Sequence, residues 1–252
     1  LKSQAQLQQT LHFLTLFECS LKSQALTPPD FCSGLFETAI QICLSTNQHS
    51  TPTVMLKIGI IGAGISGLVT AKTLKEHGFE VVIFEKEIEV GGVWAASRRY
   101  PGITTQNTRD TYTFSDFPMP KHYPEWPSGE QVQQYLSNYA EHFGLTSSLR
   151  LNTRVLNAEH LPGNQGWRIF TESGDKLSEE RVDFLTVCNG IFSQPNMPRV
   201  PGRELFEGKV FHSTEFHESH LEAVRGKRVV VVGFAKSAHD ILSQVGNVTE
   251  RP

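Results

Sequence analysis

Three glycines, Gly62, Gly64 and Gly67, stand on the spacing G-x-G-x-x-G within residues 57–86. In this pattern the first glycine permits a tight turn and the second lets a pyrophosphate approach the backbone. The third lets a helix pack closely against the preceding strand. A helix that begins at about Gly64 directs its unpaired N–H groups and its positive dipole end toward those phosphates. The turn therefore predicts that this chain binds a dinucleotide.

The segments on both sides of the turn have the patterns that would position it. Residues 58–61 form a short apolar run typical of a buried parallel strand. The helix after the turn should end at Gly78, and a second strand should follow over residues 80–85. That strand leads to Glu85, where the fingerprint has an acid for ribose hydroxyls. A glycine turn without a ligand is the alternative, but the agreement of all these features favours a dinucleotide. Because the Glu85 carboxylate would repel a 2′-phosphate, FAD or NAD fits this site.

The composition favours a globular protein with a substantial core. Of the 252 residues, 38% are hydrophobic and 19% are charged, and the formal net charge of −3 gives no strong field for nucleic acid or anionic membranes. No apolar run is long enough to span a bilayer. Four cysteines, Cys19, Cys32, Cys43 and Cys188, form no C-x-x-C pair, so we expect neither a zinc site nor a disulfide framework. A cytoplasmic location is the default expectation.

The first 54 residues differ from the rest of the chain. They are rich in Gln, Ser and Thr, they show no sustained helix or strand period, and Met55 stands directly before the first predicted strand. We interpret residues 1–54 as a disordered extension or as upstream sequence carried into the reading frame. A poorly patterned helical lobe is the alternative.

After Glu85 the chain has features suited to a flavin. Gly91 and Gly92 allow the backbone to lie close to a ring or its ribityl chain, and Trp94 would either cover a ring or belong to the core. Residues 98–120 form a long irregular stretch of the kind that builds a site or a lid.

The middle of the chain combines a helix with several strands. Ser128 and Gln131 form a capping box for an amphipathic helix that ends at Gly144. Residues 149–158 and 167–171 have strand patterns, and residues 182–190 predict a buried strand that ends in a turn. Prolines over residues 195–202 indicate a linker, which gives a domain boundary near residue 200.

A second dinucleotide-type unit is predicted over residues 227–242. A basic start leads into four valines over residues 229–232 and then into a turn and a helix, with Gly233 in the turn and Ala235 where a second glycine would stand. A complete nucleotide-binding domain needs several more strands and helices than the chain supplies before Pro252. We therefore expect the sequence to be a truncated part of a longer protein.

Residues 206–216 match the pattern F-x-G-x-x-x-H-x-x-x-F, which resembles the identifying signature of the flavin-containing monooxygenases. The glycine turn with Glu85, the run Gly91-Gly92-Val93-Trp94 and the run Phe114-Ser115-Asp116-Phe117-Pro118 resemble that family in the family's order. The resemblance covers Met55 to about Asp240. It implies an α/β fold with two Rossmann-like units, an FAD-binding domain over residues 55–200 and the truncated start of an NADPH-binding domain over residues 201–252.

The family's chemistry implies that NADPH reduces FAD, that the reduced flavin binds O2, and that a flavin hydroperoxide transfers one oxygen atom to a soft nitrogen or sulfur nucleophile. The partners implied are a small-molecule substrate and O2. No nucleic acid and no membrane segment are expected, and the oligomeric state is unknown. The predicted cofactor-binding residues are Gly62, Ala63, Gly64, Ile65, Ser66, Gly67, Glu85, Lys86, Gly92, Val93, Trp94, Thr105, Gly233 and Ser237.

The resemblance also implies catalytic candidates. The family often has an Asn before its F-S-D-F run, and here that place falls on Gln106, with Asn107 beside it. His212 is a candidate general base, but a structural role is favoured because the family's chemistry does not require that base. Arg251 is a weak candidate for a 2′-phosphate contact, so the preference for NADPH over NADH rests on analogy.

Two alternatives remain open. Baeyer–Villiger monooxygenases share most of the signature but end it in Trp, whereas this chain has Phe216, which favours oxidation of heteroatoms. A non-catalytic nucleotide-binding fragment is the other alternative, because the chain stops within the second unit.

Overall fold

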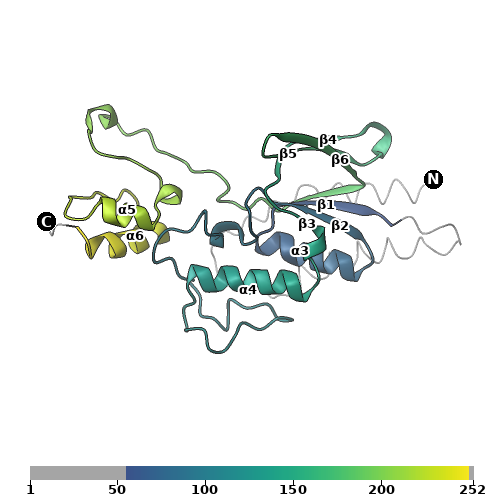
Figure 1. Ribbon diagram of the computed structural model, residues 1–252, viewed down its shortest axis with the longest axis horizontal. Helices are drawn as coiled ribbons and strands as arrows, with labels where there is room; N and C mark the ends of the chain where they lie inside the picture. The colour runs from purple at the N-terminus through teal and green to yellow at the C-terminus, as the bar shows by residue number, and fades with distance from the viewer. Residues whose placement is uncertain (1–54, 250–252) are drawn as a thin grey trace, which may run out of the picture. The chain divides into compact units, whose positions relative to one another are not determined.

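The computed structural model describes residues 55–249 (Figure 1). The predictions for residues 1–54 and for Arg251 lie outside the described residues. The described chain forms two compact units: residues 55–86 together with 148–191, and residues 87–147 together with 192–249. The assignment of an FAD domain and a nicotinamide domain to residues 55–200 and 201–252 stays a prediction.

The first unit is built on a parallel sheet with the strand order β3-β2-β1-β7. Its central strand β1 (Lys57–Ile61) pairs in parallel with β2 (Glu80–Phe84) and with β7 (Phe184–Val187), and β2 pairs in parallel with the short β3 (Leu149–Arg150). Helix α3 (Ile65–Glu76) is the crossover between β1 and β2 and lies against the sheet (Figure 1). Its buried side chains are Leu68, Ala71 and Leu74. The predicted strand, turn, helix and strand are confirmed.

A second, antiparallel sheet of β4 (Arg154–His160), β5 (Trp167–Ser173) and β6 (Lys176–Val182) belongs to the same unit. It joins the parallel sheet in one apolar cluster, whose buried members are Val82, Phe84, Ile169, Val182 and Leu185. A Cβ added at Gly59 would lie 2.9 Å from the Ile169 side chain, so the two sheets are closely packed at this point.

The prediction of one strand over residues 149–158 is wrong. The chain breaks after Arg150, because Asn152 adopts a left-handed φ of 49° and the Thr153 amide donates to the carbonyl oxygen of Glu85 at 2.8 Å. The two halves therefore enter different sheets, β3 in the parallel sheet and β4 in the antiparallel sheet.

The second unit contains α4 (Gly129–His142), which begins with the predicted capping box. The Gln131 amide donates to the Ser128 hydroxyl at 3.2 Å, and the Ser128 amide donates to the Gln131 side chain at 2.9 Å. These bonds satisfy two donors at the start of the helix. The buried face consists of Val132, Tyr135, Leu136, Tyr139 and Ala140, as the apolar spacing predicts.

The C-terminal part of the second unit contains α5 (Glu218–Ala223) and α6 (Lys236–Gly246), as Figure 1 shows. The predicted helix after the second turn is confirmed, but the predicted strand over residues 229–232 is wrong, since that stretch has no strand pairing. A strand requires a neighbour to receive its backbone hydrogen bonds. Here Val230 and Val232 are 84% and 77% exposed, and no described strand pairs with them. Short 3-10 helices complete the described chain: η1 (Gly92–Trp94), η2 (Thr146–Ser148), η3 (Pro162–Asn164), η4 (Arg203–Leu205) and η5 (Ser213–Glu215).

The architecture is α/β, with a parallel sheet and a Rossmann-like crossover in the first unit. Within residues 55–249, no helix has both the length and the apolar character needed to cross a membrane. The same residues contain no group of three or more His, Cys, Asp or Glu side chains arranged to hold a metal ion.

Candidate cofactor sites

The first glycine turn is packed so tightly that side chains are excluded. Gly62 has a φ of +102°, and a Cβ there would lie 2.5 Å from the carbonyl oxygen of Cys188. A Cβ at Gly67 would lie only 1.9 Å from the carbonyl oxygen of Gly62. These distances are far below van der Waals contact. The first glycine is therefore needed for the turn and the third for the approach of α3, as the spacing predicts.

The N-terminus of α3 has the properties of an anion site. Its N-cap residue is Gly64, no side chain caps the helix, and its first turn carries no acidic residue. Helix α4 differs, because the Ser128 side chain occupies the corresponding position there. The amides of Ile65, Ser66 and Gly67 in the first turn of α3 thus point toward the place that a phosphate would take. The residues present fit the pyrophosphate of a dinucleotide.

Glu85 lies against this turn. Its side chain is buried, at 6% exposure, and its Oε2 accepts a hydrogen bond from the Ala63 amide at 2.7 Å. The Glu85 amide donates to the carbonyl oxygen of Arg150 at 3.0 Å, so the backbone of the acid is fixed as well. Lys86, the next residue, is exposed. Within the first unit the structure therefore brings together the predicted residues 62–67 and Glu85, with the acid held beside the backbone that is predicted to bind phosphate.

The predicted flavin-contacting turn lies in the second unit. Gly91 has a φ of +137°, and a Cβ there would lie 3.1 Å from the Ala95 amide nitrogen, so glycine is required. Gly92 and Val93 begin η1, and Trp94 ends it. Trp94 is 7% exposed, and its ring meets Tyr112 edge-on with centroids 5.8 Å apart.

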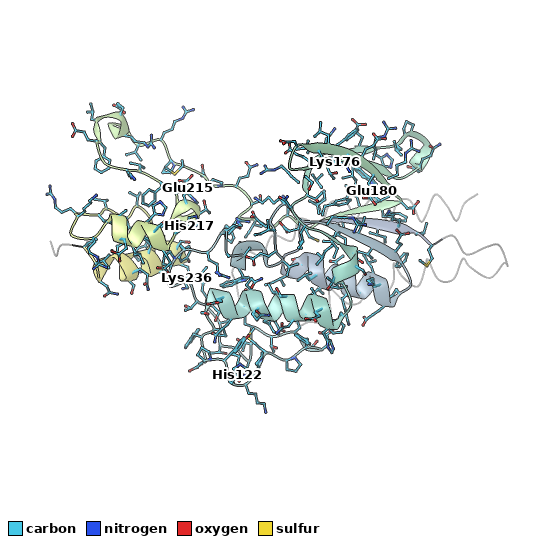
Figure 2. The ribbon with its side chains drawn as sticks, viewed as in Figure 1. His122, Lys176, Glu180, Glu215, His217 and Lys236 are labelled. Atoms are coloured by element: carbon cyan, nitrogen blue, oxygen red, sulfur yellow. The ribbon has the colours of Figure 1, made fainter. Side chains whose placement is uncertain are left out.

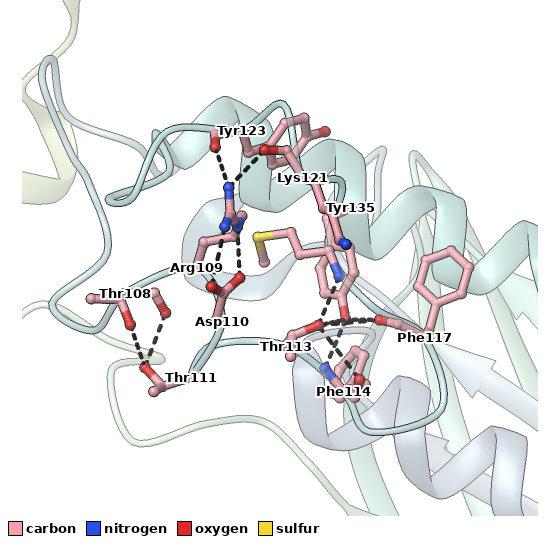
Figure 3. A network of polar contacts seen from close by, with 11 residues as sticks. Thr108, Arg109, Asp110, Thr111, Thr113, Phe114, Phe117, Lys121, Tyr123 and Tyr135 are labelled. Carbon is pink, nitrogen blue, oxygen red and sulfur yellow. Dashed lines mark hydrogen bonds and ion pairs between the residues drawn. The ribbon is translucent and has the colours of Figure 1, made fainter.

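The irregular stretch between η1 and α4 is held by Arg109 (Figure 3). One guanidinium nitrogen donates to the carbonyl oxygens of Lys121 and Tyr123 at 2.7 and 2.9 Å, and the other two pair with Asp110. The Arg109 amide also donates to the carbonyl oxygen of Glu125 at 2.7 Å. The Arg109 side chain thus links two segments of this long loop that have no regular secondary structure. These bonds give the loop a defined shape.

The F-S-D-F run packs on α4. The Phe114 amide donates to the Tyr135 hydroxyl at 2.8 Å, and that hydroxyl donates to the carbonyl oxygen of Phe117 at 2.5 Å (Figure 3). The rings of Phe114 and Phe117 stack on Tyr135, with centroids 5.6 and 5.5 Å away. Both rings also contact Tyr139. This motif has a structural role in the loop.

The candidate catalytic amides follow an anchored residue. Thr105 is 2% exposed, its amide donates to the carbonyl oxygen of Pro127 at 3.0 Å, and its hydroxyl donates to the carbonyl oxygen of Asn107 at 2.7 Å. Gln106 and Asn107 are exposed. Their backbone is therefore fixed from Thr105 while their side chains remain accessible.

The second predicted turn keeps part of the dinucleotide pattern. Gly233 has a φ of +140°, Ala235 is the N-cap residue of α6, and no side chain caps this helix or places an acid in its first turn. Ser237 lies in that first turn. The helix N-terminus thus resembles that of α3, although the strand that should precede it is not formed.

His212 has a structural role in this segment. Its Nδ1 accepts from the Thr214 amide at 3.2 Å, and its own amide donates to Glu215 at 3.1 Å, so it caps η5. This geometry supports the structural interpretation over the general base. A polar cluster around Tyr100 and Asp240 was not predicted from the sequence, although the spacing of Lys236 and Asp240 at i and i+4 is typical of an ion pair.

Comparison with known proteins decides the family. The sequence profile of the family described as flavin-binding monooxygenase-like matches residues 55–251. The chain belongs to this family. It is 32% identical over 202 residues to the N-oxide-forming dimethylaniline monooxygenase 2 of Mus musculus, in an alignment covering 75% of this chain and 37% of that protein. The chain thus spans well under half the length of this curated relative. The resemblance inferred from the motifs is confirmed.

Solved structures show the same likeness. S-allyl-L-cysteine S-oxygenase from Allium sativum superposes with a TM-score of 0.68 at 28% identity, covering 78% of this chain and 50% of that chain. Cyclohexanone monooxygenase from Rhodococcus sp. Phi1, solved with NADP+ bound, superposes with a TM-score of 0.66 at 27% identity, covering 79% and 37%. The Rossmann-like fold is therefore shared with oxygenases that act on sulfur and with one named for a ketone.

Proposed function

We propose that the whole protein is an FAD- and NADPH-dependent monooxygenase that inserts one oxygen atom from O2 into a soft nitrogen or sulfur nucleophile. The flavin-binding family supports FAD, and the NADP+-bound neighbour supports the nicotinamide cofactor. The chain spans 37% of the length of the Mus musculus relative, so the proposed activity is that of the whole protein.

The observation that carries this proposal is the position of Glu85. The buried carboxylate accepts from the Ala63 amide inside the glycine turn, which is the place where the dinucleotide fingerprint has the acid for the adenosine ribose. The amides of α3 would bind the pyrophosphate, with Gly67 allowing the helix to lie close. The negative charge also disfavours a 2′-phosphate at this turn, which assigns FAD here and NADPH to the second turn.

Bound FAD would supply the chemistry, taking a hydride from NADPH and activating O2. The chain's own residues then have to bind, orient and exclude water. We assign adenosine and pyrophosphate binding to residues 62–67 and Glu85, and contact with the nicotinamide cofactor to Gly233 and Ser237. Gln106 or Asn107 would donate or accept hydrogen bonds near the reacting groups, since their side chains are exposed on an anchored loop.

Baeyer–Villiger oxidation of a ketone is the second candidate, because a cyclohexanone monooxygenase is among the structural neighbours. Phe216 ends the signature at the position where the Baeyer–Villiger monooxygenases have Trp, and it therefore favours oxidation of a nitrogen or sulfur atom. In this structure Phe216 is 3% exposed and its ring stacks on Phe211 with centroids 5.7 Å apart.

The test is oxygenation of three probes by the whole protein under ¹⁸O2: N,N-dimethylaniline, S-allyl-L-cysteine and cyclohexanone. The proposal predicts one ¹⁸O atom in an N-oxide or sulfoxide, in an amount that depends on NADPH. Lactone as the main product would instead favour the second candidate. Oxidation of NADPH without any oxygenated probe, or no NADPH oxidation by a flavin-loaded protein, would contradict the proposal.

A further inference from the structure

A polar cluster in the second unit joins α6 to the loop before Gln106. The Tyr100 hydroxyl donates to Asp240 Oδ2 at 3.0 Å. The Lys236 ammonium pairs with both carboxylate oxygens of Asp240 and lies 3.4 Å from the Thr104 hydroxyl. Figure 2 shows Lys236 on α6, where it is the first helical residue. The Lys236 and Asp240 side chains are 27% and 14% exposed, so this ion pair is largely withdrawn from water.

Apolar packing surrounds this cluster. The Tyr100 ring is buried together with Phe216, Ile241 and Val245. Next to it, a Cβ at Gly102 would lie 2.3 Å from the Gln244 side-chain nitrogen. The turn over residues 100–102 therefore lies directly on α6. Burial raises the pKa of the Tyr100 hydroxyl to about 12, so this hydroxyl stays protonated and can donate a hydrogen bond.

The same loop is bonded to the start of α4 on its other side. The Gly129 amide donates to the carbonyl oxygen of Ile103 at 2.9 Å, and Thr104 forms an isolated antiparallel bridge with Ser128. Residues 100–105 therefore connect α6 with the N-terminal end of α4. Gln106 and Asn107 follow at once, so their position depends on both attachments.

We propose that Lys236, Asp240 and Tyr100 are positioning residues that set the placement of the loop carrying Gln106 and Asn107. This inference rests on the proposed function in so far as it concerns product formation. Lys236 directly follows the turn Gly233–Ala235, so the attachment starts at the helix end assigned to the nicotinamide cofactor. Asp240 is the shared acceptor. Tyr100 donates to it from the loop itself, and Lys236 bonds both to it and to Thr104 of the loop. None of the three needs to touch a reacting atom.

The experiment compares Lys236→Met, Tyr100→Phe and the double variant in the whole, flavin-loaded protein. Lys209→Met is the control for loss of an exposed lysine. Tyr123→Phe is the control for loss of a buried tyrosine hydroxyl. Tyr123 contacts the Arg109 side chain through its backbone oxygen, which this substitution leaves in place. Hydrogen exchange followed by mass spectrometry reads the backbone of residues 100–107. Loss of one hydrogen bond to a charged group should accelerate exchange about tenfold in each single variant. Because both side chains bond to Asp240, the double variant should show less than the product of the two effects.

The second readout separates positioning from stability. We expect the variants to reduce their flavin with NADPH at the parent rate while more of the NADPH ends as hydrogen peroxide, and Lys236→Arg should restore most of the coupling. Parent-like exchange over residues 100–107 in both single variants would overturn the inference. Faster exchange with an unchanged peroxide fraction would overturn it as well. If the parent protein forms no oxygenated product, the proposed function fails, and hydrogen exchange alone still decides whether the cluster positions the loop.

Discussion

Replacement of Glu85 separates the observed role of its carboxylate, accepting from the Ala63 amide, from its proposed role, binding the ribose of FAD. Its Oε2 accepts from the buried Ala63 amide at 2.7 Å, and it is 6% exposed. In Glu85→Ala the amide loses a charged acceptor and the ribose loses its partner. A hydrogen bond to a charged group contributes about 1.5–3 kcal/mol, so we expect FAD affinity to fall by about tenfold to about 150-fold. The apoprotein should also melt at a lower temperature, because the Ala63 amide is left without this acceptor.

Glu85→Gln distinguishes the two roles. The amide oxygen of Gln still accepts from Ala63, but the charge is lost. We therefore expect apoprotein stability close to that of the parent and an FAD affinity between those of the parent and Glu85→Ala. Flavin fluorescence titration of deflavinated protein gives the affinity, and thermal unfolding gives the stability.

Glu80→Ala is the matched control, because Glu80 starts the same strand, is half exposed at 51% of its side chain and pairs with Lys57 at the surface. Surface pairs of this kind contribute little, so its FAD affinity should equal that of the parent. An FAD affinity of Glu85→Ala equal to that of the parent would refute the assignment of the ribose to Glu85.

Three further predictions concern other parts of the sites. Gly67→Ala should abolish FAD binding or prevent folding, since its Cβ would lie 1.9 Å from the Gly62 carbonyl oxygen. Gly246→Ala should be tolerated, because a Cβ there meets open space. Flavin content measures FAD binding in both variants, and circular dichroism measures their folding. Gln106→Ala or Asn107→Ala should still oxidise NADPH but release mostly hydrogen peroxide, in a peroxide assay against product yield; equal yields in both variants would remove the loop from the mechanism. Burial raises the pKa of Tyr100 to about 12, so the stabilising contribution of its neutral hydroxyl is complete below pH 10 and is lost as the pH rises through 12. Chemical denaturation across this window should show that the free energy of unfolding falls less steeply in Tyr100→Phe than in the parent. An identical fall in both proteins would contradict the burial of the hydroxyl.

The first nucleotide turn was predictable because its information is local. The apolar strand, the glycine spacing and the terminal acid all fall within residues 57–86, and each has a steric or electrostatic reason that holds without the rest of the chain. The capping box of Ser128 and Gln131 is local for the same reason.

The elements that the local sequence did not predict correctly depend on partners far away in the chain. Strand β6 is mostly exposed and reads Lys-Leu-Ser-Glu-Glu-Arg-Val, so only its pairing with β5 makes it a strand. The valines over residues 229–232 have ideal strand propensity, yet no described strand receives their hydrogen bonds. Likewise, the contact of Tyr100 with Asp240 joins positions 140 residues apart, which no local pattern reveals.

The most direct test of the account is the flavin released by acid from the purified whole protein. The glycine turn and Glu85 together require a cofactor with a pyrophosphate and an adenosine ribose, and FMN has neither. We predict FAD close to one equivalent per chain in the parent and a large loss in Gly67→Ala. FMN in place of FAD, or one equivalent of FAD retained by folded Gly67→Ala, would contradict the central claim that this turn holds the adenosine end of FAD.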